Sequence, residues 1–229
     1  MRITSANRHD GRHCLTLTPE DSGDPNPPLR DLLIDASILG TPGDRQIAVA
    51  ALAFGTFLRG VVETEVPVSP AMSQALSAFQ APIFTVPKNI SAEGTQYTGA
   101  GSTLLLDLEH EGLLGRNTVD TGQVIALDIL PMTSWSGRLF SMDRLVVASN
   151  AEHLTRRLRG TARLGPLLAV ALAFAHELHA SRIVVPGGDF TDDPWIVGVT
   201  HLLAATGVDL LTVDRAELEE LRLVEGGAA

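Results

Sequence analysis

A nearly continuous apolar run from Gln123 to Leu130 constrains the fold of this chain more than any other stretch. Apolar residues that do not alternate with polar ones are typical of a strand buried on both faces, as in a parallel sheet. Parallel strands need long connections, and the sequence around this run alternates between helical and strand patterns. We expect helices over 104–114, 151–159, 166–180 and 194–206, an acidic helix over 215–223, and further strands over 144–148, 182–185 and 208–213. This order predicts an α/β fold.

The first 90 residues have a less regular pattern. We expect strands over 14–18, 61–68 and 83–86, and helices over 29–39, 46–58 and 70–79. The sequence contains no recognisable internal repeat. We therefore predict a smaller α+β N-terminal part over residues 1–90. An α/β domain over residues 91–229 follows it, with a Rossmann-like parallel sheet flanked by helices.

Composition excludes several classes of protein. The net charge of −10 disfavours binding to nucleic acid and to membrane surfaces. Cys14 is the sole cysteine, so the chain can form neither an intrachain disulfide nor a thiolate zinc cluster, and we expect no zinc. The longest apolar runs, 47–58 and 167–175, are shorter than the roughly 20 residues that a membrane helix needs. We expect a soluble, cytoplasmic protein.

Small residues form a loop from Thr98 to Thr103, directly before an apolar segment. Gly99 and Gly101 can adopt backbone angles that larger residues avoid. If a helix follows, the free amides at its start, with those of Ser102 and Thr103, would attract a phosphate group. The alternative is an ordinary turn with a Ser or Thr cap, because the loop is neither a Walker loop nor a full dinucleotide fingerprint.

A later loop carries three carboxylates, Asp189, Asp192 and Asp193. Carboxylate oxygens suit a hard cation, so Asp189 and Asp192 are candidate Mg²⁺ ligands. The alternative is that the loop starts a helix, with Asp193 capping it just before Pro194.

Asp128 is the one charged residue in the apolar run, and a buried carboxylate needs a partner. It could contact a ligand at the end of the sheet, or it could lie at an edge and face water. His110, between two glutamates, is expected on a solvated helix end. Six arginines gather between residues 138 and 163, where they suit phosphate recognition or pairing with acidic neighbours. They are Arg138, Arg144, Arg156, Arg157, Arg159 and Arg163.

The order of elements in the C-terminal part resembles the PP-loop ATP pyrophosphatases of the adenine nucleotide alpha hydrolase superfamily. It is most similar to the cyano-deazaguanine synthases of the queuosine pathway. That family has a Ser-Gly-Gly-x-Asp-Ser loop that holds the pyrophosphate of ATP, and residues 98–103 align with it position by position. The resemblance implies a site for ATP or AMP, with Mg²⁺, at Thr98, Gly99, Gly101, Ser102 and Thr103, with Asp128 nearby.

The chain departs from this family at important positions. Ser102 stands where the family has an aspartate, Ala100 replaces a glycine, and the zinc-binding cysteine cluster is absent. These departures favour a degenerate PP-loop protein that binds a nucleotide or a small phosphorylated ligand without the full family activity. One alternative is a non-catalytic interaction subunit of a biosynthetic or defence assembly, with a protein partner. Another is an active ATP-dependent adenylating enzyme, in which Asp128, Asp189 or Asp192 replaces the missing carboxylate.

Overall fold

The computed structural model describes residues 1–40, 42–91, 101–110, 117–118, 122–156, 158–187, 190, 193–214 and 218. Its strands are β1 (Arg2–Asn7), β2 (His13–Thr18), β3 (Asp31–Ile34), β4 (Gly60–Thr64), β5 (Thr85–Pro87), β6 (Ser102–Leu106), β7 (Asn117–Thr118), β8 (Gly122–Pro131), β9 (Arg138–Phe140), β10 (Arg144–Ser149), β11 (Ala180–Pro186) and β12 (Asp209–Val213). Its α-helices are α1 (Gly43–Phe54), α2 (Pro70–Phe79), α3 (Ala151–Thr155), α4 (Gly165–Ala175) and α5 (Pro194–Ala204). Short 3-10 helices cover Gly55–Phe57 and Gly160–Leu164.

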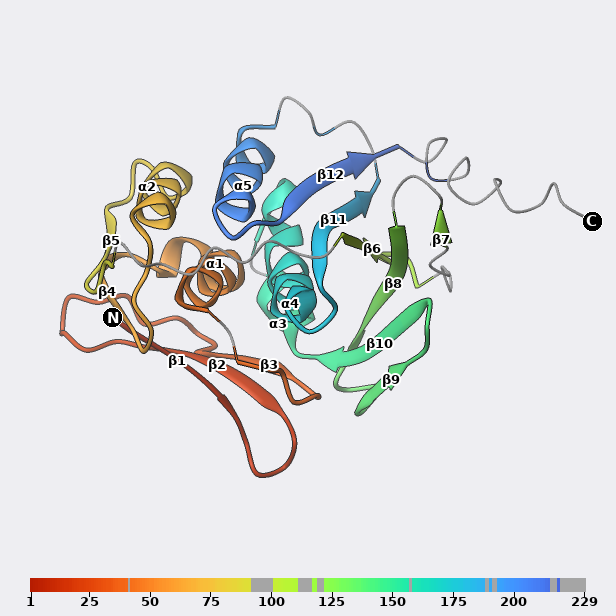
Figure 1. Cartoon of the computed structure of the whole chain (residues 1–229). Coiled ribbons are helices and arrows are strands. Elements are labelled where there is room, and N and C mark those ends of the chain that lie inside the picture. Colours follow the sequence, from red (N-terminus) through yellow and green to blue (C-terminus); the bar gives the residue numbers. More distant parts are fainter. Residues whose placement is uncertain are drawn as a thin grey trace, which may run out of the picture.

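The strands form one mixed sheet in the order β12-β11-β6-β8-β10-β3-β2-β1-β4-β5, with β7 beside β8 and β9 beside β10. The C-terminal strands β12, β11, β6, β8 and β10 are all parallel to their neighbours in this order. At the other end, β1, β2 and β3 are joined antiparallel. The described chain is thus a mixed α/β fold with a sheet flanked by helices (Figure 1), and the Rossmann-like detail stays a prediction.

The sheet contains a structural repeat that the sequence does not reveal. The order β1-β2-β3-α1-β4-α2-β5 recurs as β6-β8-β10-α4-β11-α5-β12, and the strand order reads as a palindrome around the β3–β10 junction. That junction is antiparallel, with Ile34 opposite Ser149. Helix α1 contacts β1, β2 and β4, while α4 contacts the equivalent strands β6, β8 and β11. The halves differ in one strand, because β2 is antiparallel to β1 whereas β8 is parallel to β6.

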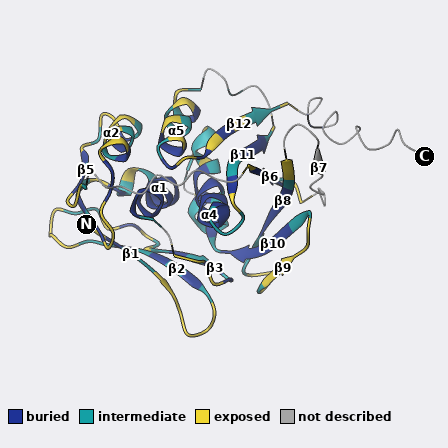
Figure 2. Ribbon diagram, viewed as in Figure 1, coloured by how far each residue is buried: buried dark blue, intermediate teal, exposed yellow. Residues whose placement is uncertain are grey.

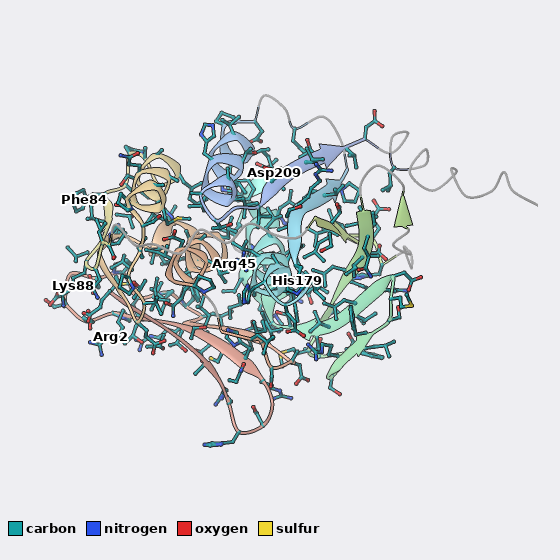
Figure 3. The ribbon with its side chains drawn as sticks, in the orientation of Figure 1. Arg2, Arg45, Phe84, Lys88, His179 and Asp209 are labelled. Atoms are coloured by element: carbon teal, nitrogen blue, oxygen red, sulfur yellow. The ribbon has the colours of Figure 1, made fainter. Side chains whose placement is uncertain are left out.

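Helices α1 and α4 pack against each other at the centre of the molecule (Figure 1). Every residue of α1 is buried, including Arg45, which is 1% exposed and lies in the interior in Figure 3. The two helices approach closely at Gly165, where an added Cβ would lie 2.5 Å from the carbonyl oxygen of Leu52. The main core forms around these helices, as the dark-blue ribbon of Figure 2 shows.

Most of the expected elements in the C-terminal part are confirmed. The run 123–130 lies in β8, the segment 144–148 in β10, and the apolar segment 166–180 begins with α4. Asp193 caps α5, because its carboxylate accepts hydrogen bonds from the amides of Trp195 and Ile196. The alternative interpretation of this residue as a helix start is therefore confirmed. The acidic helix expected after residue 214 lies almost entirely outside the described residues.

Two expected helices are strands. Residues 29–39 contain β3, which pairs antiparallel with β2. Residues 104–114 begin with the end of β6, whose five residues are all buried in the middle of the sheet. Short apolar runs of this kind do not distinguish a strand from a helix by periodicity, and pairing with neighbouring strands decides the outcome.

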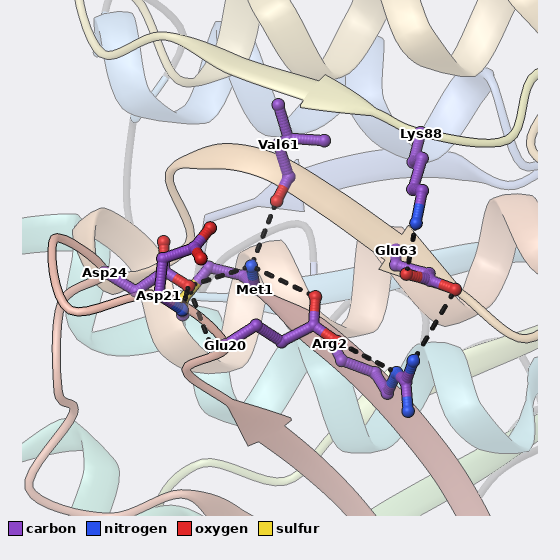
Figure 4. Close-up of polar contacts among 8 residues, drawn as sticks. All are labelled: Met1, Arg2, Glu20, Asp21, Asp24, Val61, Glu63 and Lys88. Carbon is purple, nitrogen blue, oxygen red and sulfur yellow. Dashed lines mark hydrogen bonds and ion pairs between the residues drawn. The ribbon is translucent and has the colours of Figure 1, made fainter.

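Charged side chains join the first strand to its surroundings. The Met1 ammonium donates to the Asp24 carboxylate (3.0 Å) and to the carbonyl oxygen of Val61 (3.1 Å), as Figure 4 shows. On the neighbouring strand, Glu63 pairs with Lys88 at 2.8 Å. Hydrogen bonds from two loop amides lower the pKa of Asp24 to about 2.

None of the helices in the described part of the chain has the length and apolar character that a membrane span requires.

Candidate functional site

A cavity of about 360 Å³ lies where three parallel strands end. Leu106 ends β6, Pro131 ends β8 and Ser149 ends β10, and all three residues line it. Helices α3 and α4 close the other side through residues such as Thr155 and Leu167. Ligands of open α/β sheets bind beyond the carboxyl ends of the strands, and the volume falls within the range of small-molecule sites.

The cavity combines an apolar wall with a few polar groups. Alternation along β8 points Leu127 and Ile129 into it, while Asp128 projects to the other face of the sheet. Asp107, the first residue after β6, and His110 supply polar groups at one end. This distribution suits a small ligand, because the apolar wall gives affinity and the polar groups fix orientation.

His110, whose side chain is 46% exposed, is held in place by the buried carboxylate of Asp128. Its Nδ1 lies 2.6 Å from Oδ1 of Asp128, whose side chain is only 4% exposed. Asp128 Oδ2 accepts a hydrogen bond from Arg144 at 2.7 Å, and Arg144 also lies 3.9 Å from Asp107. Because an ionised carboxylate only accepts hydrogen bonds, His110 carries a proton on Nδ1, and the Asp128 contact fixes the orientation of the ring.

The backbone at His110 adopts a conformation that side-chain-bearing residues rarely use. Its φ is +56°, in the left-handed region. A non-glycine residue there stores strain that the surrounding structure must hold, and such residues are enriched at functional sites. At this position the bond to Asp128 holds the strained residue at the cavity wall.

A second charged pair, on α3, also borders the cavity. Glu152, on α3, lines the cavity and accepts a hydrogen bond from Arg156 at 2.6 Å. This bond lowers the pKa of Glu152 below its ordinary value. Glu152 is therefore a carboxylate at neutral pH on the wall of the cavity.

The described part of the glycine-rich loop lies elsewhere. Gly101 directly precedes β6, and Ser102 and Thr103 are its first buried residues. The amide of Ser102 donates to the carbonyl oxygen of His179, and its hydroxyl donates to that of Leu178. The loop thus leads into the amino end of a parallel strand, at the edge opposite the cavity, and not into the expected helix. Thr98 and Gly99 lie outside the described residues.

The structure shows what surrounds Asp128, the one charged residue in the apolar run 123–130. Asp128 does not face water at an edge, because its side chain is 4% exposed and contacts Arg144 and His110, and it is not among the residues that line the cavity. The candidate magnesium ligands Asp189 and Asp192 lie outside the described residues. Within the parts of the chain that the structure describes, no group of three or more His, Cys, Asp or Glu residues could hold a metal ion.

Three of the six arginines pair with acidic neighbours. Arg138 binds Glu177, Arg144 binds Asp128 and Arg156 binds Glu152. Arg157 lies outside the described residues. Pairing with acids, one of the two interpretations of this group, therefore holds for these three side chains.

Sequence reasoning missed Asp107 and assigned His110 to a solvated helix end. A signal was present, because Asp107 directly follows the apolar residues 104–106. A polar residue at the end of a buried parallel strand is where ligands bind in such sheets. The expectation of a helix over 104–114 hid this signal.

Comparisons of the chain with protein-family models, with curated proteins and with solved structures give no match. The resemblance to PP-loop ATP pyrophosphatases therefore rests on the sequence alone, and the helix that it implies directly after residues 98–103 is absent, because residues 102–106 form β6.

Proposed function

We propose that the protein binds a nucleotide or another small phosphorylated molecule in the cavity at the carboxyl ends of β6, β8 and β10. The observation that carries the proposal is the position of this cavity, which is where α/β sheets bind such ligands. The resemblance to nucleotide-binding proteins supports the ligand class. The proposed binding site is therefore not the glycine-rich loop expected from the sequence but the cavity at the opposite edge of the sheet.

The polar groups of the cavity suit a phosphate that arrives with a cation. Glu152 lines the cavity as a carboxylate, and Mg²⁺ in proteins is commonly held by one or two carboxylates together with substrate phosphates. His110 would orient the ligand by a hydrogen bond. Asp128 serves this site by holding His110, and its ion pair with Arg144 leaves it unsuited to replace the missing metal carboxylate of an adenylating enzyme.

Calorimetry with ATP and AMP, each with Mg²⁺ at millimolar concentration, tests the proposal. Leu167→Trp fills the cavity from α4, and we expect it to abolish the heat of binding and the rise in melting temperature. Leu211→Trp, at an exposed position on β12, is the matched control and should bind normally. Absence of binding by the unaltered protein, or equal binding by both variants, would contradict the proposal.

A protein partner is the second candidate, supported by exposed apolar side chains on and beside β9. Leu139 and Phe140 of β9 and Met142 after it are 60%, 52% and 80% exposed, and Figure 2 shows β9 as exposed. Clustered apolar side chains on a surface mark interaction sites. If a partner covers these side chains, Phe140→Ser should abolish co-purification of that partner, whereas Phe84→Ser, at an exposed site directly before β5, should not.

A further inference from the structure

The carboxyl end of β1 carries a second group of interacting polar side chains, in the half of the repeat opposite the cavity. Ser5 and Asn7 of β1 and His13 of β2 lie on the face of the sheet that α1 covers, because they alternate in step with the buried Ile3 and Leu15. Ser5 Oγ lies 3.0 Å from His13 Nε2, and His13 Nδ1 lies 3.0 Å from Asn7 Oδ1. A hydroxyl, an imidazole and an orienting amide thus form a continuous chain.

Hydrogen bonds to the backbone fix the direction of this chain. Asn7 Nδ2 donates to the carbonyl oxygen of Ile38, and Asn7 Oδ1 accepts from the Ile38 amide, so the orientation of the Asn7 amide is determined. Its Oδ1 can only accept, which places the proton of neutral His13 on Nδ1. Nε2 is then an acceptor, and the Ser5 hydroxyl donates to it. This is the arrangement of a nucleophile, a general base and an orienting group.

The surroundings favour the basic form of the histidine and access to the serine. His13 is 6% exposed, and burial lowers its pKa, so the imidazole is neutral and able to accept a proton at pH 7. Ser5 is only half-buried, between the exposed Asn7 and Glu65. Glu65 accepts a hydrogen bond from the Ser5 amide and lies 3.4 Å from Gln46, in the first turn of α1. The positive end of that helix dipole is therefore on the same side as Ser5.

We propose that Ser5, His13 and Asn7 form a nucleophilic site that acts on uncharged carboxylic esters. The Ser5 oxygen bonds to the ester carbonyl carbon while its proton passes to His13 Nε2. The tetrahedral intermediate expels the alcohol, which takes that proton, and leaves the acyl group on Ser5. Water, deprotonated by the same nitrogen, then releases the acid and restores the hydroxyl. Uncharged substrates follow from the Glu65 carboxylate at the site, which repels anions.

This site is separate from the cavity, so its test is independent of nucleotide binding. The unaltered protein is incubated with a fluorophosphonate probe, and intact mass and peptide mapping measure the adduct. We expect one adduct per chain, on Ser5, that Ser5→Ala abolishes. His13→Gln should slow the labelling by about 100-fold or more, because it removes the general base. Ser77→Ala, at an exposed serine of α2, is the control and should label normally.

A thiol variant keeps the test decisive if His13→Gln fails to fold. In a Cys14→Ser background, Ser5→Cys should react with iodoacetamide faster at pH 7 than Ser77→Cys, since His13 accepts the thiol proton. Hydrolysis of p-nitrophenyl acetate, lost in Ser5→Ala, would establish turnover. An unlabelled protein at millimolar probe, or an adduct rate that His13 does not affect together with equal thiol rates, would overturn the proposal.

Discussion

At the scale of single residues, the most consequential interaction is the ion pair between Asp128 and Arg144. The carboxylate is almost completely buried in a central strand, and a buried charge is tolerated only when it is paired. Arg144 therefore compensates the buried charge of Asp128 between β8 and β10, and Asp128 in turn holds His110 at the cavity. A change to either partner should affect stability before it affects binding.

Arg144→Met should lower the free energy of unfolding by about 2 kcal/mol or more, because it leaves the Asp128 carboxylate with only His110 as a partner. Urea denaturation measures the loss. The double variant Asp128→Asn, Arg144→Met should lose less than the two single changes added together, since the pair is then removed as a whole. Arg156→Met breaks an exposed pair and should change stability by no more than about 0.5 kcal/mol. Equal losses in the two arginine variants would contradict the assignment.

His13 should make stability depend on pH. Its pKa in the folded protein is below the unfolded value of about 6.5, because burial disfavours the charged ring. The unfolded chain therefore binds a proton more readily, and the contribution of His13 is fully present above about pH 6.5 and falls as the pH decreases through the folded pKa. Denaturation curves between pH 8 and pH 5 should show a smaller decrease for His13→Gln than for the unaltered protein. An identical decrease would exclude this contribution.

At the scale of elements, the contact between α1 and α4 holds the two halves together. It depends on Gly165, where the helices are too close for a side chain. Helical propensity alone would favour alanine at this position by up to about 1 kcal/mol. The observed glycine therefore reflects packing between the helices.

Gly165→Ala should destabilise the protein by about 1–3 kcal/mol, because a methyl group 2.5 Å from the Leu52 carbonyl oxygen forces the helices apart. Gly40→Ala is the matched control, since an added Cβ there meets no atom within 4 Å. Denaturant midpoints of the two variants measure the difference. A Gly165→Ala protein as stable as the control would show that the helices can separate without cost.

Elements were predictable where they are long and show a clear pattern. The predictions of β8 and of α4 are correct, because elements that are buried on all sides consist almost entirely of apolar residues. The predictions of helices at β3 and β6 were wrong, because each strand has only three consecutive apolar residues, and so short a run fits either a strand or a helix. The incorrect helix over 104–114 also prevented the prediction of the candidate site, because Asp107 and His110 lie within that segment. Asp128 was recognised as a charge that needs a partner, but Arg144 and His110 are 16 and 18 residues away from it, and only the sheet brings the three together.

At the scale of the whole molecule, two copies of one arrangement share a sheet and place a polar site at the end of the first strand of each half. One half places Ser5 and His13 near the end of β1, and the other places Asp107 and His110 after β6. No sequence periodicity reveals this relation, because different residues fill equivalent positions. The repeat implies that each half can specialise, with esters proposed for the first and a phosphorylated ligand for the second.

A ligand site at the carboxyl end of the C-terminal strands is the feature on which the proposed function depends most. Titration of ATP with Mg²⁺ into isotopically labelled protein, followed by amide chemical shifts, tests this directly. We predict that the largest shifts belong to Asp107, His110 and Glu152, which line the cavity. Shifts centred on Gly101 to Thr103, at the opposite edge of the sheet, or no shifts at millimolar nucleotide, would contradict it.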